Sequence, residues 1–301
     1  MNDNGIDDII FGTDTDFIYV LLDDQTVAPN FPIDLGNNIQ SEPAVYIMED
    51  EKIVLTGCKN NNFYAFNYST GELRFVIATG DDVYNSPSFD QDGNIYFGSD
   101  DGNVYAVDID GNALSGFPLY LGNTISGSII FSDLDGNQSE DMIVGTGSGE
   151  VFAFHSNLDL FEYFPVNYQF PITSSPQVID IDFDGDLEII AGTSGDLLAI
   201  DLKYNTASNA DFWSLYKGDW QRVGKYYPGE NSGIGDCNLP EAGDTNCDQI
   251  IDILDIISII NIIMDGTSGY SEYQLWSADI TGDNIIDILD IIAVINVIIG
   301  N

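Results

Sequence analysis

Short apolar runs alternate with polar turns from the start of the chain to about residue 227, which predicts β-strands rather than helices. A strand that ends in Gly, a polar turn and a strand of the type aromatic-Ala-apolar recur five times. The anchor residues of the latter strand are separated by 45, 41, 47 and 46 residues: Tyr19, Tyr64, Tyr105, Phe152 and Leu198. A period in the forties with about four short strands per unit predicts β-propeller blades. We therefore expect a mainly β fold of about five blades over residues 1–227.

Other marks recur at the same phase. Phe-Pro pairs at 31–32, 117–118 and 164–165 predict outer strands, and Ser/Pro-containing segments after them predict inner strands. The first repeat begins mid-blade, so we expect these blades to be part of a larger ring, with an open edge. Residues 228–242 carry turn residues without periodicity and predict a linker to a second domain at 243–301.

The second domain contains an acidic segment that occurs twice, 35 residues apart, each time before an Ile/Leu-rich helix. Oxygen-bearing side chains stand at loop positions 1, 3, 5, 9 and 12, the ligand spacing of a calcium-binding EF-hand loop, and position 7 offers a backbone carbonyl. The expected Ca2+ ligands are Asp244, Asn246, Asp248, Ile250, Asp252 and Asp255, then Asp279, Thr281, Asp283, Ile285, Asp287 and Asp290. The alternative is an acidic turn in which Asp252 and Asp287 only cap the helices.

This pair of loops resembles the type I dockerin, a module of two calcium loop–helix repeats that docks secreted proteins onto cohesin domains. The resemblance implies calcium binding and a cohesin-like domain or cell-surface scaffold as partner. Gln249 and Asn284 replace the Gly usual at position 6. Positions 10 and 11, which select the cohesin in the family, are apolar here: Ile253, Leu254, Ile288 and Leu289. This surface binds a partner or packs back on its own chain.

The blade repeats resemble the quinoprotein-like and FG-GAP propeller families, most closely at residues 97–108. Two acidic loops between inner and second strands resemble the calcium loops of FG-GAP blades. Their candidate ligands are Asp180, Asp182, Asp184, Asp186 and Glu188, then Asp133, Asp135, Asn137, Ser139 and Asp141. The alternative is a polar hairpin turn, for which Asp-Gly is common chemistry.

The formal charge of −43, with seven Lys and Arg, argues against nucleic acid and anionic membranes as partners. No apolar stretch predicts a membrane span. Among the three Cys, Cys237 and Cys247 are spaced so that they either form a disulfide or remain free. No secretory signal follows Met1, so we expect the C-terminal part of a longer secreted or cell-surface protein.

No nucleophile, phosphate-loop or zinc motif stands out, and the single histidine, His155, is expected in a turn. We therefore expect a secreted calcium-binding propeller that acts as a non-catalytic binding or display module, tethered by its dockerin-like domain. Polysaccharide is a further candidate ligand. One alternative, implied by the dockerin resemblance, is part of a polysaccharide-degrading hydrolase or lyase; another is that the C-terminal domain only caps the propeller.

Overall fold

The chain divides into two compact units, Met1–Gly233 and Ile234–Asn301, which are treated separately here. The computed structural model describes residues 8–48, 51–125, 127–181, 186–203, 212–214, 216–217, 224–228, 242–245, 251, 253–265, 272–282 and 285–298. Apart from residues 228 and 242, the predicted linker lies outside these ranges, as do both Cys237 and Cys247. No helix in the described part of the chain is long and apolar enough to cross a membrane.

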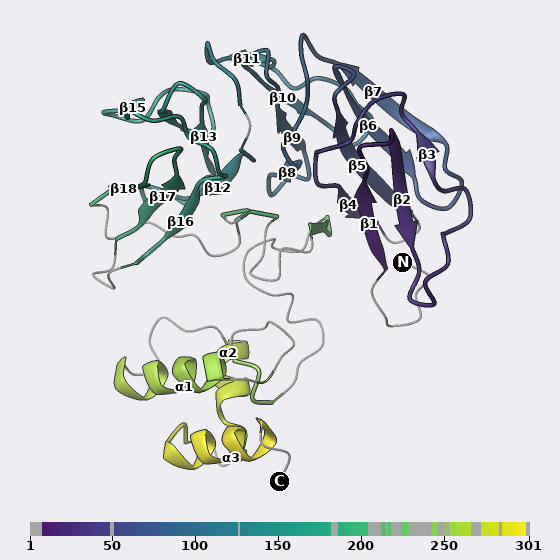
Figure 1. The fold of residues 1–301 in the computed structure, drawn as a ribbon. Helices are drawn as coiled ribbons and strands as arrows, with labels where there is room; N and C mark the ends of the chain where they lie inside the picture. Colours follow the sequence, from purple (N-terminus) through teal and green to yellow (C-terminus); the bar gives the residue numbers. More distant parts are fainter. Residues whose placement is uncertain are drawn as a thin grey trace. The chain divides into compact units, whose positions relative to one another are not determined.

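The described strands of the first unit form five small sheets that follow one another in chain order, and consecutive strands within each sheet pair antiparallel (Figure 1). Sheet 1 contains β1 (Ile9–Gly12), β2 (Phe17–Leu21) and β3 (Ile33–Asp34). Sheet 2 contains β4 (Ala44–Ile47), β5 (Lys52–Cys58), β6 (Asn62–Asn67) and β7 (Leu73–Ala78). Sheet 3 contains β8 (Ser88–Phe89), β9 (Ile95–Gly98), β10 (Asn103–Val107) and β11 (Leu119–Tyr120).

Sheets 4 and 5 repeat this order of strands. Sheet 4 contains β12 (Ile130–Ser132), β13 (Asp141–Gly145), β14 (Glu150–Phe154) and β15 (Val166–Asn167). Sheet 5 contains β16 (Gln177–Ile179), β17 (Glu188–Gly192) and β18 (Leu197–Asp201). The mainly β fold with about five propeller-type blades is therefore confirmed, and the Phe-Pro pairs precede β3, β11 and β15 as predicted.

The recurring glycine that ends the second strand of each blade has a steric cause. A Cβ on Gly57 would lie 2.4 Å from Val83, and one on Gly98 would lie 2.4 Å from Ile125. Both neighbours belong to the chain segment that leads into the next blade. Because non-bonded carbons normally stay at least about 3.5 Å apart, only glycine permits this close approach.

Three hydrophobic clusters join consecutive sheets. One joins sheets 1 and 2, a second joins sheets 2, 3 and 4, and a third joins sheets 4 and 5. Side chains of alternate strand positions form these clusters; in β10, for example, Val104 and Ala106 are buried while Tyr105 is half-buried. Each blade thus buries its faces against its neighbours, as the period-two pattern requires.

The chain after sheet 5 returns along the inner strands. The Trp213 carbonyl accepts a hydrogen bond from Phe131 N in β12 (2.9 Å), and the Ser214 carbonyl accepts one from Val178 N in β16 (3.2 Å). Further along, β19 (Lys225–Tyr226) pairs in parallel with β4. Trp213 is buried in the central cluster with its ring 5.0 Å from that of Phe89. The segment that contains Trp213 and Ser214 therefore links the inner strands of sheets 4 and 5.

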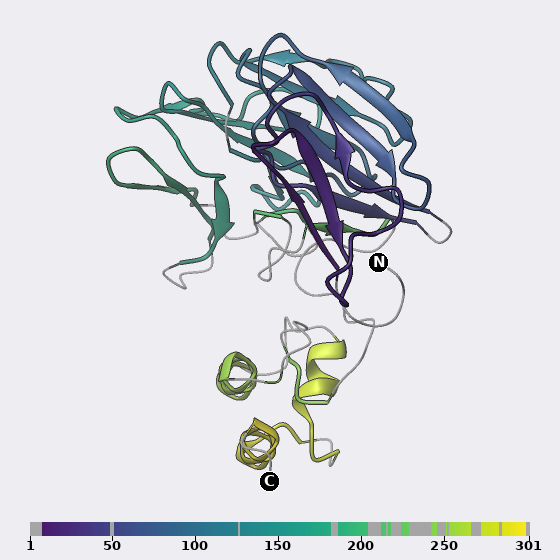
Figure 2. The same cartoon turned by 45° about the vertical axis from the view of Figure 1, so that its right-hand side comes forward.

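The second unit contains α1 (Ile253–Asp265), α2 (Glu272–Ala278) and α3 (Ile288–Ile298). Figure 2 shows α1 and α3 end-on, side by side, and their contact buries Ile259, Ile262 and Val294 together with Ala278 of α2. Ile259 and Val294 occupy the same position in the 35-residue repeat. The two loop–helix repeats are therefore packed on each other as equivalent halves.

Candidate metal centres

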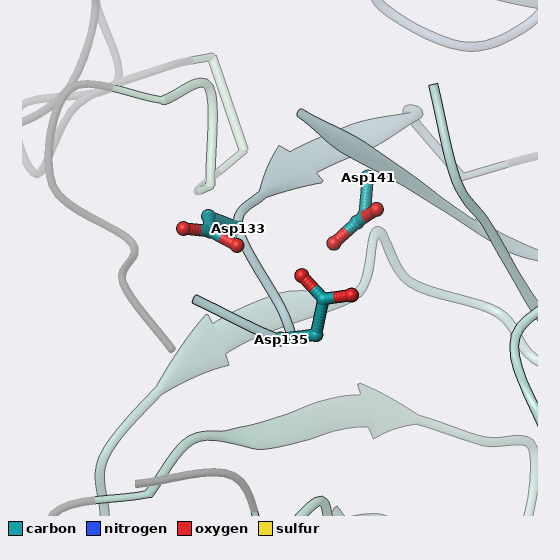
Figure 3. Close-up of side chains that lie close together, drawn as sticks. All are labelled: Asp133, Asp135 and Asp141. Carbon is teal, nitrogen blue, oxygen red and sulfur yellow. The ribbon is translucent and has the colours of Figure 1, made fainter. Parts of the chain in front are cut away.

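The loop between β12 and β13 brings three carboxylates together. Oxygen atoms of Asp133, Asp135 and Asp141 all lie within 4.8 Å of one another, and Asp133 and Asp141 are buried. Figure 3 shows the carboxylates of Asp135 and Asp141 facing each other, with Asp133 beside them. Three hard oxygen donors in one place suit a cation such as calcium better than a soft metal.

Backbone amides shape this loop. The Asp133 carboxylate accepts hydrogen bonds from the amides of Gly136 (2.7 Å), Asn137 (3.0 Å) and Gln138 (2.8 Å), so the chain curls around it. The Asn137 side-chain oxygen accepts the Ser139 amide at 2.7 Å, and both residues are exposed. The structure thus brings three of the five predicted ligands together: Asp133, Asp135 and Asp141.

His155 lies beside this cluster, although the sequence analysis did not place it there. It does lie in a turn, as expected, but its Nδ1 lies 3.2 Å from Asp141 Oδ1 and 4.0 Å from Asp135 Oδ2. Burial raises the pKa of Asp141, and the nearby charge of Asp135 raises it further, while the Leu134 amide and His155 oppose the rise. A cation held among these oxygens would relieve the same crowding of negative charge.

The equivalent loop before β17 gathers a related group. Asp186, Glu188 and Asp201 bring ligand oxygens within 4.8 Å of one another, and Asp186 and Glu188 are buried. Glu188 Oε1 is buried without a hydrogen-bond partner in the described part of the chain, which leaves it available to a cation. Lys203 Nζ lies 2.7 Å from Asp201 and 3.5 Å from Asp186, and this side chain is 60% exposed. Asp180 is half-buried, and Asp182 and Asp184 lie outside the described residues.

The two propeller loops share one hydrogen bond that defines their geometry. The acid at loop position 9 accepts the amide of position 2 in both: Asp141 from Leu134 (2.8 Å) and Glu188 from Ile181 (2.7 Å). The remaining oxygen of Asp141 lies 3.2 Å from His155 Nδ1, and that of Glu188 is buried without a partner in the described part of the chain. Loops that only formed hairpin turns would not require a buried acid at this position.

The loops of the second unit bury their last acid completely. Asp290 Oδ1 accepts the amide (3.0 Å) and hydroxyl (2.9 Å) of Thr281, and its Oδ2 accepts the Asp287 amide at 2.9 Å. Asp255 accepts the Thr245 amide at 2.7 Å in the first loop. Both Asp255 and Asp290 are 0% exposed. Position 12 therefore folds back onto the start of each loop.

The structure describes only some of the other predicted ligands of this unit. Asp244 is buried and Asp279 is half-buried, whereas Ile285 is 60% exposed. Asp287 caps α3, because its Oδ1 accepts the Leu289 amide at 2.7 Å. Asp287 therefore caps the helix with one carboxylate oxygen, and its second oxygen takes no part in that hydrogen bond. Asn246, Asp248, Ile250, Asp252 and Asp283 lie outside the described residues.

The second unit is strongly acidic. Residues 234–301 contain twelve Asp and Glu and no Lys, Arg or His. A fully buried carboxylate is costly unless a cation or several hydrogen bonds compensate it. Since no cationic side chain occurs in this unit, the compensating cation would have to come from solution.

Comparison with known families decides what this unit is. Residues 242–299 match the Dockerin type I domain. The match covers the two loop–helix repeats and confirms the resemblance drawn from their spacing. Domains of this family bind cohesins. No curated protein matches the chain significantly in sequence.

Solved structures resemble this chain at low sequence identity. BBS1N, crystallised with ARL6DN, is 18% identical with a TM-score of 0.47 and matches 69% of this chain. BamB from Moraxella catarrhalis is 16% identical with a TM-score of 0.49, and the computationally designed Ika8 protein is 16% identical with a TM-score of 0.48; each matches 67% of this chain. This chain spans 63%, 57% and 56% of the three proteins, respectively.

Proposed function

We propose that this chain is an extracellular, calcium-supported β-propeller that is attached through its dockerin domain to a cohesin-bearing scaffold or cell surface. In this proposal the propeller is a non-catalytic binding or display module. The observation that carries it is the pair of fully buried acids, Asp255 and Asp290, each folded back onto its loop in a unit without a cationic side chain.

Calcium fits both dockerin loops. Asp244 and Asp255 would hold the ion in the first loop, and Asp279, Thr281 and Asp290 would hold it in the second, with the other predicted ligands completing each set. The bound ion would neutralise the carboxylates and so couple folding to calcium. At a free concentration about 100 times the dissociation constant, this coupling stabilises the folded unit by about 2.7 kcal/mol.

Exposed isoleucines form the proposed partner surface. Ile253, Ile257 and Ile260 follow one face of α1, and Ile288, Ile292 and Ile295 occupy the equivalent positions on α3. Their exposed fractions range from 37% to 66%, and Leu289 beside them is 53% exposed. Leu254 belongs to the predicted surface, but its side chain lies outside the described residues. An apolar stripe of this kind is typical of a helix face that binds a protein partner.

Serine substitutions on this stripe test the proposal. Replacing both Ile253 and Ile288 by Ser is expected to weaken binding to type I cohesin domains by about 100-fold, since each buried isoleucine contributes about 1.5 kcal/mol or more. Isothermal titration of the full chain against a panel of type I cohesins in calcium measures the effect. Val297→Ser is the matched control: Val297 is also exposed on α3, but nine residues from Ile288 and so on the opposite helix face.

Other outcomes would favour the alternatives. If no cohesin in the panel binds wild-type protein, and removal of residues 242–301 lowers the melting temperature of the propeller, the C-terminal unit is a cap. Hydrolysis or cleavage of a polysaccharide by the purified chain would contradict the non-catalytic role.

The propeller loops are expected to bind calcium as well. Asp141→Asn keeps the shape of the side chain but removes a charge, so it is expected to abolish the calcium-dependent stabilisation of its blade. If calcium saturates this loop, chelation removes about 2.7 kcal/mol of stability. Each kcal/mol corresponds to about 2–4 °C in melting temperature, so wild-type protein should lose about 5–10 °C on chelation. Asp159→Asn, in an exposed turn of the same blade, should behave as wild type. An equal response of Asp141→Asn and wild type to the chelator would contradict calcium binding in this loop.

A further inference from the structure

The propeller unit contains a cavity of about 520 Å³ to which four sheets contribute. Its walls are the segments where the chain enters successive inner strands, including Ser86, Ser128 and Ser175, together with Tyr216 of the returning segment. The volume lies within the range of roughly 300–1,000 Å³ that holds small-molecule ligands. None of the described residues that line it is a candidate metal ligand.

Neutral polar groups dominate the lining. Ser175 Oγ accepts the Ser128 amide at 2.9 Å, which fixes its oxygen and leaves its hydroxyl proton to donate elsewhere. The Gln177 side-chain amide has no hydrogen-bond partner among the described residues. Ser86 Oγ donates to the Glu42 carbonyl at 2.8 Å and lies 3.3 Å from the Tyr216 hydroxyl. The wall thus offers several donors and acceptors held in fixed places.

Charge argues against anions and metal ions as ligands of this cavity. Among the described lining residues, Glu42 alone carries a carboxylate, and it is paired with Lys217 Nζ at 3.1 Å, so this part of the wall is close to neutral. The net charge of −43 on the whole chain repels anions. A metal ion would require several oxygen ligands of the carboxylate type, which this lining lacks.

Aromatic rings supply the remaining surface. Tyr84 and Tyr216 line the cavity, and Tyr84 is held by a hydrogen bond from its hydroxyl to Asp82 (2.9 Å) and by Lys59 Nζ at 5.1 Å from its ring centre. A ring face beside hydroxyl and amide groups matches a molecule with apolar C–H faces and a polar rim.

From this lining we infer that the cavity binds a neutral saccharide, whose hydroxyls bond to Gln177 and the serines while a sugar face rests on a tyrosine ring. This inference concerns the propeller alone and does not depend on attachment through the dockerin domain.

Titration calorimetry of the full chain with neutral disaccharides of gluco, manno, galacto and xylo configuration tests the inference. At least one should bind with a dissociation constant on the order of 1 mM or lower. Gln177→Ala and Tyr216→Ala should each weaken that binding at least about tenfold. Asp159→Asn should leave it unchanged, and melting curves report whether each variant is folded.

Three results would overturn the inference. The first is that none of the disaccharides binds. The second is equal binding by wild type and a folded Gln177→Ala variant, which would place the sugar elsewhere. The third is tighter binding of a digalacturonate than of every neutral disaccharide, which would mean that the cavity selects for charge.

Discussion

Replacing Asp290 by Asn is expected to unfold the dockerin unit while the propeller sheets stay folded. The Asp290 carboxylate accepts three hydrogen bonds, from the Thr281 amide and hydroxyl and from the Asp287 amide. An amide group in its place would turn a donor toward at least one of these donors and would leave it unsatisfied. The cost is about 3 kcal/mol or more, including weaker calcium binding.

A loss of this size is decisive for so small a unit. A core of fewer than about 70–80 residues rarely supplies more than about 3–5 kcal/mol of stability. Because Ile259 of α1 and Val294 of α3 lie in one cluster, losing the second loop removes part of the core of the first. Both helices should therefore be lost together.

Limited proteolysis in calcium, followed by mass spectrometry, measures this directly. Wild-type protein should be protected across residues 251–298, and Asp290→Asn should be cleaved there as rapidly as wild type in chelator. Glu241→Gln, which removes a carboxylate outside both twelve-residue loops, is the control. Protection of Asp290→Asn equal to that of the control would contradict the structural role of position 12.

Trp213→Ala is expected to destabilise the propeller unit by about 3–5 kcal/mol, the usual cost of truncating a buried tryptophan. Trp213 is 1% exposed and packs edge-on against Phe89, which in turn stacks on Tyr226 at 4.6 Å. Its carbonyl also accepts the Phe131 amide of β12. Removal of the ring would open the contact between the returning segment and the inner strands.

Urea denaturation of the full chain, followed by far-ultraviolet circular dichroism, measures the change in the free energy of unfolding of the propeller. Trp276→Ala is the matched control, because Trp276 lies in α2 of the other unit and is 50% exposed. A loss below about 1 kcal/mol for Trp213→Ala would mean that the returning segment is not part of the propeller core.

The sequence predicted the elements that have a period. The anchors from Tyr19 to Leu198 located five blades. In the first four blades the glycine before the anchor recurs because the chain entering the next blade passes within contact distance of it. The dockerin loops were found for the same reason, because the same ligand spacing occurs twice, 35 residues apart.

Contacts across strands could not be predicted from spacing within one loop. His155 meets Asp141, and Asp201 meets Glu188, because the acid at position 9 begins a second strand opposite the end of the third. The pairing of Met142 with Phe154 places Asp141 opposite His155, and Glu188 pairs directly with Asp201. Aligning the repeats on Phe152 and Leu198 would have supplied this register, so the signal was present in the sequence.

The measurement that tests the central claim most directly is calcium titration calorimetry of the full chain, compared with a variant carrying both Asp255→Asn and Asp290→Asn. If each dockerin loop binds one calcium ion, wild-type protein will bind two more calcium ions per chain than the variant, whatever number the propeller loops bind. Equal stoichiometry in the two proteins would contradict it.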